Sequence, residues 1–307
     1  MPQAEIEIPK HYQPTFERNM VHANQQKYSK LIGLVDVGPA SGEGVSPVDL
    51  FEDTEAQEAN DRKGDSPDME LGRSRRWVTP RKWEWGTLVD GMDVLKQVLD
   101  PTSELVTAAR MAMDRYLDRQ IIMPAFFGNV LQGKDMTDAI GGTQAVYDTT
   151  KYDVPVTVGS AGGATPVGMN VDKLIEVKRR FIAEEVDVSG ERLNIGLCST
   201  QWANLFGDVR ATSGDYVNQR PISKGDHEML MNMNYVLIEK LPIDTATNRR
   251  FNPVWVKRGI KLRTWMDTKV NIGPDASKKF RPRVYIERAA GACRAQEGLV
   301  MKVISQE

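Results

Sequence analysis

Residues 52–70 form a long acidic segment that contains almost nothing able to enter a hydrophobic core. Their sequence is EDTEAQEANDRKGDSPDME, with eight acidic residues and two basic ones. The wider segment 52–76 has only four apolar residues, which are Ala56, Ala59, Met69 and Leu71. Ordering a backbone costs ~1–2 kcal/mol per residue, and so few small or flexible apolar groups cannot offset that cost. The segment is therefore either disordered or ordered by another surface.

Two predicted strands flank this acidic segment. VSPVDLF (45–51) precedes it and WVTPRKWEW (77–85) follows it. Successive side chains of a strand point to opposite faces, so we expect Trp83 and Trp85 to share one face. Pro80 has no amide proton to donate and should place the second strand at a sheet edge or a bulge. We interpret the two strands as the legs of a long arm that the acidic segment closes.

Basic residues follow the acidic segment within the same arm. Charges segregated in this way suit contact between copies of one protein, although a solvated charged loop is the more common origin of such a run. Trp and Arg side chains dominate the energetics of protein interfaces. We therefore expect six residues near the base of the arm to contact a neighbouring subunit: Arg73, Arg75, Arg76, Trp77, Trp83 and Trp85. The alternative is single-stranded nucleic acid stacked on the aromatic rings, but the adjacent acidic run would repel phosphate.

The strongest predicted helix spans residues 100–128. Its apolar residues recur at helical spacing, and most of its charged residues lie on the other side. Asp100 can cap its first turn, and Gly128 closes it. Pro124 should kink or end the helix, because proline cannot donate the helical hydrogen bond.

Two further helices are predicted from apolar periodicity. One covers residues 14–32. The other follows a capping Asn170 over residues 171–186, and its predicted inward face consists of Val171, Leu174, Ile175, Phe181 and Ile182.

The C-terminal two-thirds of the chain is rich in predicted strands. We expect a buried strand at residues 192–200 and a short helix at residues 200–206. The further strands are expected at residues 235–243, 253–266, 283–294 and 298–305. This mixture indicates an α+β fold, and a chain of 307 residues suggests about two domains.

Composition and charge exclude several classes of protein. The formal net charge is -2, whereas a dedicated nucleic-acid binder normally carries an excess of basic residues. No stretch approaches the ~20 apolar residues needed to span a bilayer, and the N-terminal residues lack an apolar signal core, so we expect neither membrane insertion nor export. Cys198 and Cys293 form neither a disulfide framework nor a zinc site, which favours folding in a reducing cytosol.

The sequence contains no recognisable catalytic, cofactor or metal site. Gly133 and Lys134 are followed by Asp135 rather than Ser or Thr, so they form no phosphate-binding loop. The glycine-rich stretch GSAGGATPVG could surround an anion but is better interpreted as a mobile surface loop. No metal-binding motif is present.

Candidate nucleophiles and bases also lack partners in the sequence. Ser160 lies in no nucleophile elbow, and Cys198 is most simply a small core residue. The three histidines are interpreted as exposed polar residues: His11, His22 and His227. An enzyme with residues 52–76 as a lid is the alternative from a different class, and it requires a titratable cluster that the sequence does not show.

Four stretches resemble a known family. They are RRWVTPRKWEWGTLVDGMDVLKQVLDPTSELVTAARMAMDRYLDRQIIMPAFFG, STQWANLFGDVRATSGDYVN, PVWVKRGI and RAAGACRAQEGLVMKVIS, in chain order. Together they are similar to a family of tailed-bacteriophage major capsid proteins and extend over most of the chain from about residue 75 onward. The residues before them match that family in character rather than in sequence.

The resemblance implies the Hong Kong 97-type capsid fold. Its parts would be an N-terminal arm (1–36), an extended E-loop (37–92), a peripheral domain with a spine helix (93–190), an axial domain (191–280) and C-terminal strands returning to the peripheral domain (281–307). In that family the E-loop lies across a neighbouring subunit, which would explain why the acidic segment has no core of its own. No motif places the covalent cross-link that one lineage forms.

The resemblance also implies a function without catalysis or cofactors. The chain would form hexamers and pentamers in the icosahedral head shell around double-stranded DNA, with non-specific contact to that DNA. A portal protein, and scaffolding and decoration proteins where the phage has them, would be its other partners. Assembly would occur in the host bacterial cytoplasm, and the protein would end up in the virion. The alternative is an encapsulin-type compartment, which shares the fold but encloses enzymes.

Overall fold

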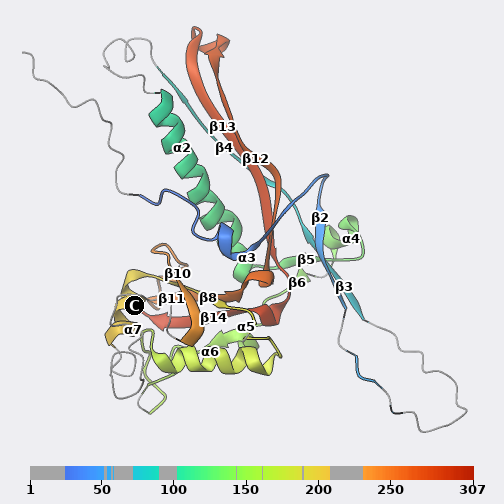
Figure 1. Cartoon of the computed structure of the whole chain (residues 1–307), viewed down its shortest axis with the longest axis vertical. Helices are drawn as coiled ribbons and strands as arrows, with labels where there is room; N and C mark the ends of the chain where they lie inside the picture. Colours follow the sequence, from blue (N-terminus) through green and yellow to red (C-terminus); the bar gives the residue numbers. More distant parts are fainter. Residues whose placement is uncertain are drawn as a thin grey trace, which may run out of the picture.

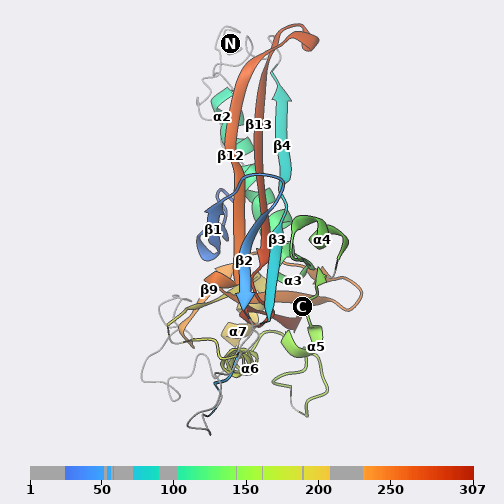
Figure 2. The ribbon, with the colours of Figure 1, turned by 90° about the vertical axis from the view of Figure 1, so that its right-hand side faces the viewer.

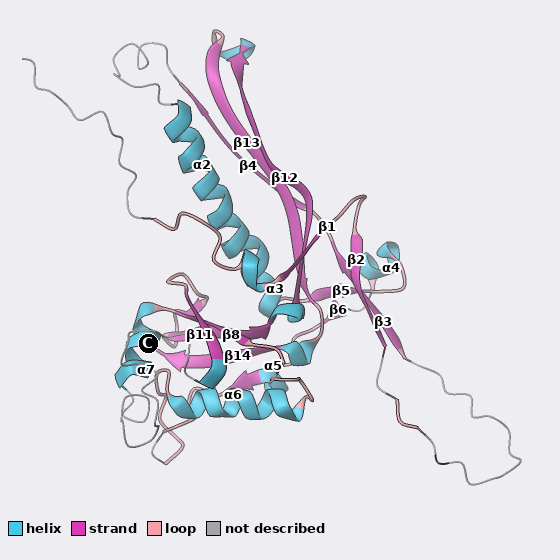
Figure 3. Cartoon of the chain, viewed as in Figure 1, coloured by secondary structure: helices cyan, strands magenta, loops and turns pink. Residues whose placement is uncertain are grey.

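The computed structural model describes residues 25–51, 54–56, 58, 72–89, 102–142, 144–160, 162–188, 190–207 and 231–307. Within these ranges the strands form three sheets, and helices lie beside two of them (Figures 1 and 3). The predicted α+β class is confirmed.

The first sheet is long and narrow and projects away from the rest of the chain (Figures 1 and 2). Its strand order is β1-β12-β13-β4, with β1 parallel to β12 and the other pairs antiparallel. The strands are β1 (Asp36–Pro39), β12 (Ile260–Asp275), β13 (Arg281–Arg294) and β4 (Arg81–Leu88). We call it the long sheet.

The predicted spine helix lies along the long sheet. It consists of α2 (Thr102–Tyr116), a π-helical turn (Leu117–Ile122) and α3 (Met123–Phe127). Proline has no amide proton, so the carbonyl four residues before Pro124 would lose its partner in a regular α-helix. The π-helical turn lies immediately before that proline, and it shifts the hydrogen bonds by one residue. The expected disturbance at Pro124 is confirmed, but the chain stays helical as far as Phe127.

A hydrophobic core joins the spine helix to the long sheet. Met113, Leu117 and Phe126 of the helix pack in one buried cluster with Trp83 of β4 and Ile286 of β13. Met113 and Leu117 belong to the apolar stripe that the sequence predicts for the helix. The spine helix is therefore held by one buried face.

The second sheet carries the strands of the other hydrophobic core. Its order is β7-β14-β11-β8-β9, and β10 pairs with β11 at one side. The strands are β7 (Asp153–Val154), β14 (Val300–Gln306), β11 (Arg249–Val256), β8 (Leu193–Leu197), β9 (Met233–Leu237) and β10 (Ile243–Asp244). Every residue of β8 is buried, which confirms the predicted buried strand. Helix α6 (Val171–Ala183) lies along this sheet, and α7 (Ser199–Gly207) follows β8 (Figure 1).

The third sheet is small and contains the projecting hairpin. Its order is β2-β3-β5-β6, and the short helix α4 (Met136–Gly141) connects β5 to β6. The strands are β2 (Val45–Phe51), β3 (Arg73–Val78), β5 (Val130–Gln132) and β6 (Gln144–Ala145). We call β2 and β3 the hairpin; they point away from the long sheet in Figures 1 and 2.

The second leg of the predicted arm is divided between two sheets. β2 pairs with β3, whereas β4 pairs with β13 in the long sheet. The break falls at Thr79 and Pro80, where proline cannot contribute to a ladder. The chain crosses β13 closely there, because a Cβ on Gly291 would lie 2.3 Å from the carbonyl oxygen of Thr79. The acidic segment between β2 and β3 lies mostly outside the described residues.

The predicted N-terminal helix needs correction. Residues 25–31 of the predicted N-terminal helix are not helical, and only Ile32–Leu34 forms a 3-10 turn. The buried carboxylate of Asp118 accepts hydrogen bonds from Gln26, Ser29 and the amide of Lys30, and these contacts fix the segment in a non-helical conformation. Residues 1–24 lie outside the described ranges.

The domain boundary expected after residue 280 falls within the long sheet and not between two sheets. β12 and β13 pair along most of their length on either side of it, and both belong to the long sheet. β14, which was expected to return with β13, pairs with β11 and β7 in the second sheet. The peripheral and axial domains remain predictions for this chain.

The inward face of α6 differs from its prediction in two residues. Leu174 and Phe181 are fully buried, but Ile175 and Ile182 are 48% and 59% exposed. The buried face instead includes Lys173, whose ammonium donates to the carbonyl oxygens of Val167, Gly168 and Ile304 at 2.7–2.9 Å. Because three carbonyl oxygens accept its hydrogen bonds, Lys173 can be buried on the inward face of α6, where Ile175 was expected.

Burial lowers the pKa of Lys173 from its ordinary value of 10.5 to about 8. The unfolded chain then binds more protons than the folded chain between these values, so this residue makes stability rise with pH across that window. The charged ammonium costs stability below pH 8, and that cost disappears as pH rises.

We expect Lys173→Met to remove this pH dependence. From pH 8 to 10 the free energy of unfolding of the wild type should rise relative to the variant, by up to about 1.4 kcal/mol per pH unit. Urea unfolding at several pH values measures the difference. Parallel pH profiles of the two proteins would show that the native lysine keeps its ordinary pKa.

Candidate functional site

The six residues expected to contact a neighbouring subunit lie on β3 and β4. Along β3 the side chains alternate, so Arg73, Arg75 and Trp77 lie on one face and Arg76 on the other. Arg76 is 3% exposed, whereas Arg73 and Arg75 are exposed. Two of the four β3 residues are therefore directly accessible in the single chain.

The exposed face of the hairpin is basic and aromatic. Arg73 lies over the ring of Phe51, 5.1 Å from its centroid. Arg75 donates two hydrogen bonds to Asp49, at 2.6 and 2.9 Å, and these lower the pKa of that carboxyl. With Lys134, these residues line a surface groove of about 440 Å³ beside the hairpin. An acidic segment of another molecule would be complementary in charge to this groove.

The indole of Trp77 is partly buried within the small sheet. Its Nε1 donates to the carbonyl oxygen of Gly133 at 3.0 Å. A side chain at residue 133 would collide with the backbone of Ala139 in α4, at 2.6 Å. Trp77 thus fixes the turn between β5 and α4 against β3.

Trp83 and Trp85 lie on the face of β4 that packs against the spine helix. Trp83 is 6% exposed and stacks on Tyr116, with ring centroids 5.2 Å apart. Trp85 is partly buried against the same core. Their observed contacts are within the chain, and an inter-subunit role for any of the six residues remains a prediction.

Arg76 was expected at a subunit contact but points into its own chain. It pairs with Glu297 and donates to the carbonyl oxygen of Arg294 at 3.0 Å. The strand pattern could have shown its direction, since Arg76 shares a face with Val78. Its partner could not be found in the same way, because Glu297 lies 221 residues further along the chain.

No catalytic or metal site is found among the described residues. Their Cys, Asp and Glu side chains form no group of three that could hold a metal ion, and the histidines lie in the residues that the structure does not describe. Cys293 is buried, which raises the pKa of its thiol to about 12 and keeps it protonated. In the described part of the chain no helix is long and apolar enough to cross a membrane.

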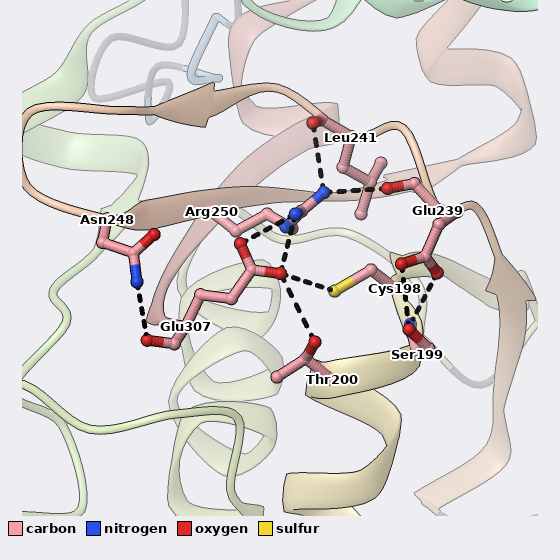
Figure 4. Close-up of polar contacts among 8 residues, drawn as sticks. All are labelled: Cys198, Ser199, Thr200, Glu239, Leu241, Asn248, Arg250 and Glu307. Carbon is pink, nitrogen blue, oxygen red and sulfur yellow. Dashed lines mark hydrogen bonds and ion pairs between the residues drawn. The ribbon is translucent and has the colours of Figure 1, made fainter.

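Cys198 takes part in a structural cluster at the end of the second sheet (Figure 4). Arg250 donates to both carboxylate oxygens of Glu307 at 2.7 Å, and Asn248 donates to the carbonyl oxygen of that residue. The Cys198 thiol, fully buried, and the Thr200 hydroxyl face the same carboxylate at 3.9 and 3.4 Å. The expected core role of Cys198 is confirmed, and the cluster ties residues 306–307 to α7 and β11.

The family of the chain follows from sequence comparison. A family model described as phage capsid protein matches residues 8–307. The chain therefore belongs to the phage capsid protein family, and it is a structural protein that forms the head shell of a phage. No curated protein sequence matches it.

Solved structures share its fold. The chain is similar to the capsid of cyanophage P-SCSP1u, with a TM-score of 0.71 and 13% identity over 96% of this chain and 93% of that one. It is similar to a structure of Mycobacterium phage Che8, with a TM-score of 0.68 and 12% identity over 96% and 97%. Cyanophage Pam1 gives a TM-score of 0.67 and 13% identity over 99% of both chains. The fold is of the Hong Kong 97 type, as expected, and the encapsulin alternative is not favoured.

We expect the two tryptophans of β4 to differ in their contribution to the stability of the subunit. Trp83→Ala should cost ~3–5 kcal/mol, as for other buried large aromatic residues. Trp85→Ala should cost clearly less, because part of its indole is already exposed. Denaturant unfolding of the isolated subunit measures both. Equal losses of stability for the two variants would contradict the prediction that Trp83 is the more deeply buried of the two.

Proposed function

We propose that the chain is the major subunit of an icosahedral phage head, in which it forms hexamers and pentamers around double-stranded DNA. The match of the family model to residues 8–307 carries the proposal. Contact of the inner surface with DNA would be non-specific, since the formal net charge is only -2. A portal protein, and scaffolding or decoration proteins, would complete the head, and assembly would take place in the host cytoplasm.

The shape of the single chain supports assembly with neighbours. The long sheet and the hairpin both project from the chain (Figures 1 and 2). Phe51 at the end of β2 is 61% exposed, and Phe280 at the tip between β12 and β13 is 71% exposed. β3 pairs with β5 at Arg76 and Trp77, and the outer part of the hairpin is two-stranded. A two-stranded ribbon alone is marginally stable at best in water. Contacts from a second copy would cover these projecting ends.

The absence of catalysis is part of the same proposal. Cys198 and Glu307, a thiol beside an acid, serve the structural cluster described above. A shell protein requires self-assembly only, and the buried ion pairs of this chain join its own strands and helices.

Electron microscopy of the expressed chain tests the proposal. We expect capsomers and closed shells with hexamers and pentamers, and particles from a phage-producing host should contain double-stranded DNA. Particles that contain a protein cargo and no DNA would favour an encapsulin-type compartment. A chain that stays monomeric at every protein concentration, also with lysate of the producing host added, would contradict a shell function.

We further expect the acidic segment to be needed for closing the shell and not for folding the subunit. The informative variant deletes residues 53–71 and joins β2 to β3 by a short Asn-Gly turn, because a deletion as far as residue 76 would also remove the buried Arg76. Its thermal unfolding should match the wild type, while closed particles should be lost in electron micrographs. Particles of normal size and yield would show that this segment makes no essential contact.

A further inference from the structure

One partly buried carboxylate lies where the hairpin, the spine helix and the two larger sheets meet. Glu297 belongs to a 3-10 turn (Glu297–Leu299) that connects β13 of the long sheet to β14 of the second sheet. Its two oxygens face different arginines: Oε2 accepts from Arg76 of β3, and Oε1 lies 3.3 Å from Arg294 of β13. The two guanidinium groups therefore share a single acid.

Arg294 connects this acid to the end of the spine helix. It is fully buried, and its Nη1 donates to the carbonyl oxygens of Phe126 at 2.9 Å and Gly128 at 3.0 Å. The last carbonyls of a helix lack partners within the helix and favour a cation. Gly128 also stands shortly before β5 of the small sheet. Arg294 thus holds the point where the spine helix ends and the small sheet begins.

Arg76 connects the same acid to the hairpin. One nitrogen donates to Glu297 and the other to the carbonyl oxygen of Arg294, so both arms of the guanidinium are engaged. A planar guanidinium binds two acceptors only in one orientation. The contact therefore restrains the direction of β3 and not merely its distance from β13.

Stability alone does not explain this cluster. Two buried guanidinium groups share one partly buried carboxylate, which leaves one positive charge in excess. Burial alone would raise the pKa of Glu297, but the hydrogen bond and charge of Arg76 and the charge of Arg294 lower it, so the acid is ionised. A well-packed apolar group is often no less stable than a buried ion pair, but it has no preferred direction.

Other contacts also hold the hairpin: Val78 of β3 packs with Cys293 of β13 in a small apolar cluster, and Val48 of β2 packs against the core of the second sheet. Such apolar contacts have no preferred direction, so the angle of β3 depends on the directional contact of Arg76.

Trp77 binds Gly133, which belongs to the same small sheet and moves with it. The close crossing of Thr79 over Gly291 fixes one point of the chain against β13 and can act as a pivot. Arg76 lies on the hairpin side of that pivot.

We propose that Arg76 and Glu297 are positioning residues that set the angle at which the hairpin leaves the rest of the chain. Through that angle they direct the hairpin toward a neighbouring subunit, and this last step alone rests on the proposed function. Arg294 anchors the same acid to the spine helix, so the hairpin and the helix end keep a fixed relation.

Hydrogen exchange of the isolated subunit, followed by mass spectrometry, tests whether the contact between Arg76 and Glu297 restrains the hairpin. In Arg76→Met and Glu297→Gln, peptides from β2 and β3 should exchange about tenfold faster, while β8 keeps its wild-type rate. Arg76→Lys should behave like Arg76→Met, because lysine keeps the charge but lacks the planar fork. It also serves as the second variant if Arg76→Met does not fold.

Two controls separate positioning from general destabilisation. Asp49→Asn breaks the exposed pair with Arg75 within the hairpin and should leave the exchange of β3 unchanged. Leu197→Ala removes a fully buried side chain of β8 and should speed exchange in the second sheet instead. The double variant of Arg76→Met and Glu297→Gln should exchange no faster than either single variant, since both remove the same contact.

Wild-type exchange of β3 in Arg76→Lys, or additive effects in the double variant, would overturn the positioning role.

Particle assembly is a separate measurement. Arg76→Lys should alter the size distribution or lower the yield of particles, and Asp49→Asn should not. Faster exchange in a variant that still forms normal particles would contradict the inference that the angle of the hairpin matters for assembly. Wild-type subunits that form no particles would contradict the proposed function and leave the exchange result standing.

Discussion

The contact between Phe126 and Trp255 is the interaction on which the two larger parts of the chain depend. Phe126 lies in the last turn of the spine helix, Trp255 lies in β11, and their fully buried rings are 4.7 Å apart. The indole nitrogen of Trp255 donates to the carbonyl oxygen of Leu34, which also ties the N-terminal segment to this place. Large aromatic side chains contribute much buried area at one point. The spine helix, the second sheet and the segment before β1 are thus held together by a single cluster.

Polar groups around that cluster give it a defined geometry. Lys302 of β14 lies 5.1–5.4 Å from the ring centroids of Phe127, Tyr147 and Phe251, and it pairs with Asp153 at 2.9 Å. A cation over aromatic faces is attracted to them, and more strongly when both are shielded from water. Apolar burial therefore brings the parts together, and directional polar contacts set their orientation. Such a division suits a shell subunit, whose projecting parts must meet neighbours at reproducible angles.

The spine helix and the hairpin show how far sequence reasoning could reach. The helix was recognised because its cap, its apolar stripe and its terminal glycine agree, and Pro124 correctly marked a disturbance. The π-helical turn could not be foreseen, since it coincides with Asp118 holding residues 26–30, a contact about 90 positions away along the chain. In the arm, the alternation of β4 correctly placed Trp83 and Trp85 together. Pro80 predicted an edge strand or a bulge, and β4 does lie at the edge of the long sheet. The break into two sheets could not be predicted, because the crossing over Gly291 is invisible without the fold.

By itself the sequence determined the local elements, the α+β class, the acidic segment without a core and a resemblance to capsid proteins. These follow from periodicity, capping residues and composition, which act over a few neighbouring positions. Only the tertiary structure decided which acid pairs with Arg76, that Lys173 replaces Ile175 in the core, and that β13 and β14 belong to different sheets. Each of these depends on a partner far along the chain: the Glu297 carboxylate for Arg76, the carbonyl oxygen of Ile304 for Lys173, and paired strands for β13 and β14. Two nearer carbonyl oxygens complete the surroundings of Lys173. A buried charge is stable only where such partners converge, and their convergence is a property of the folded chain.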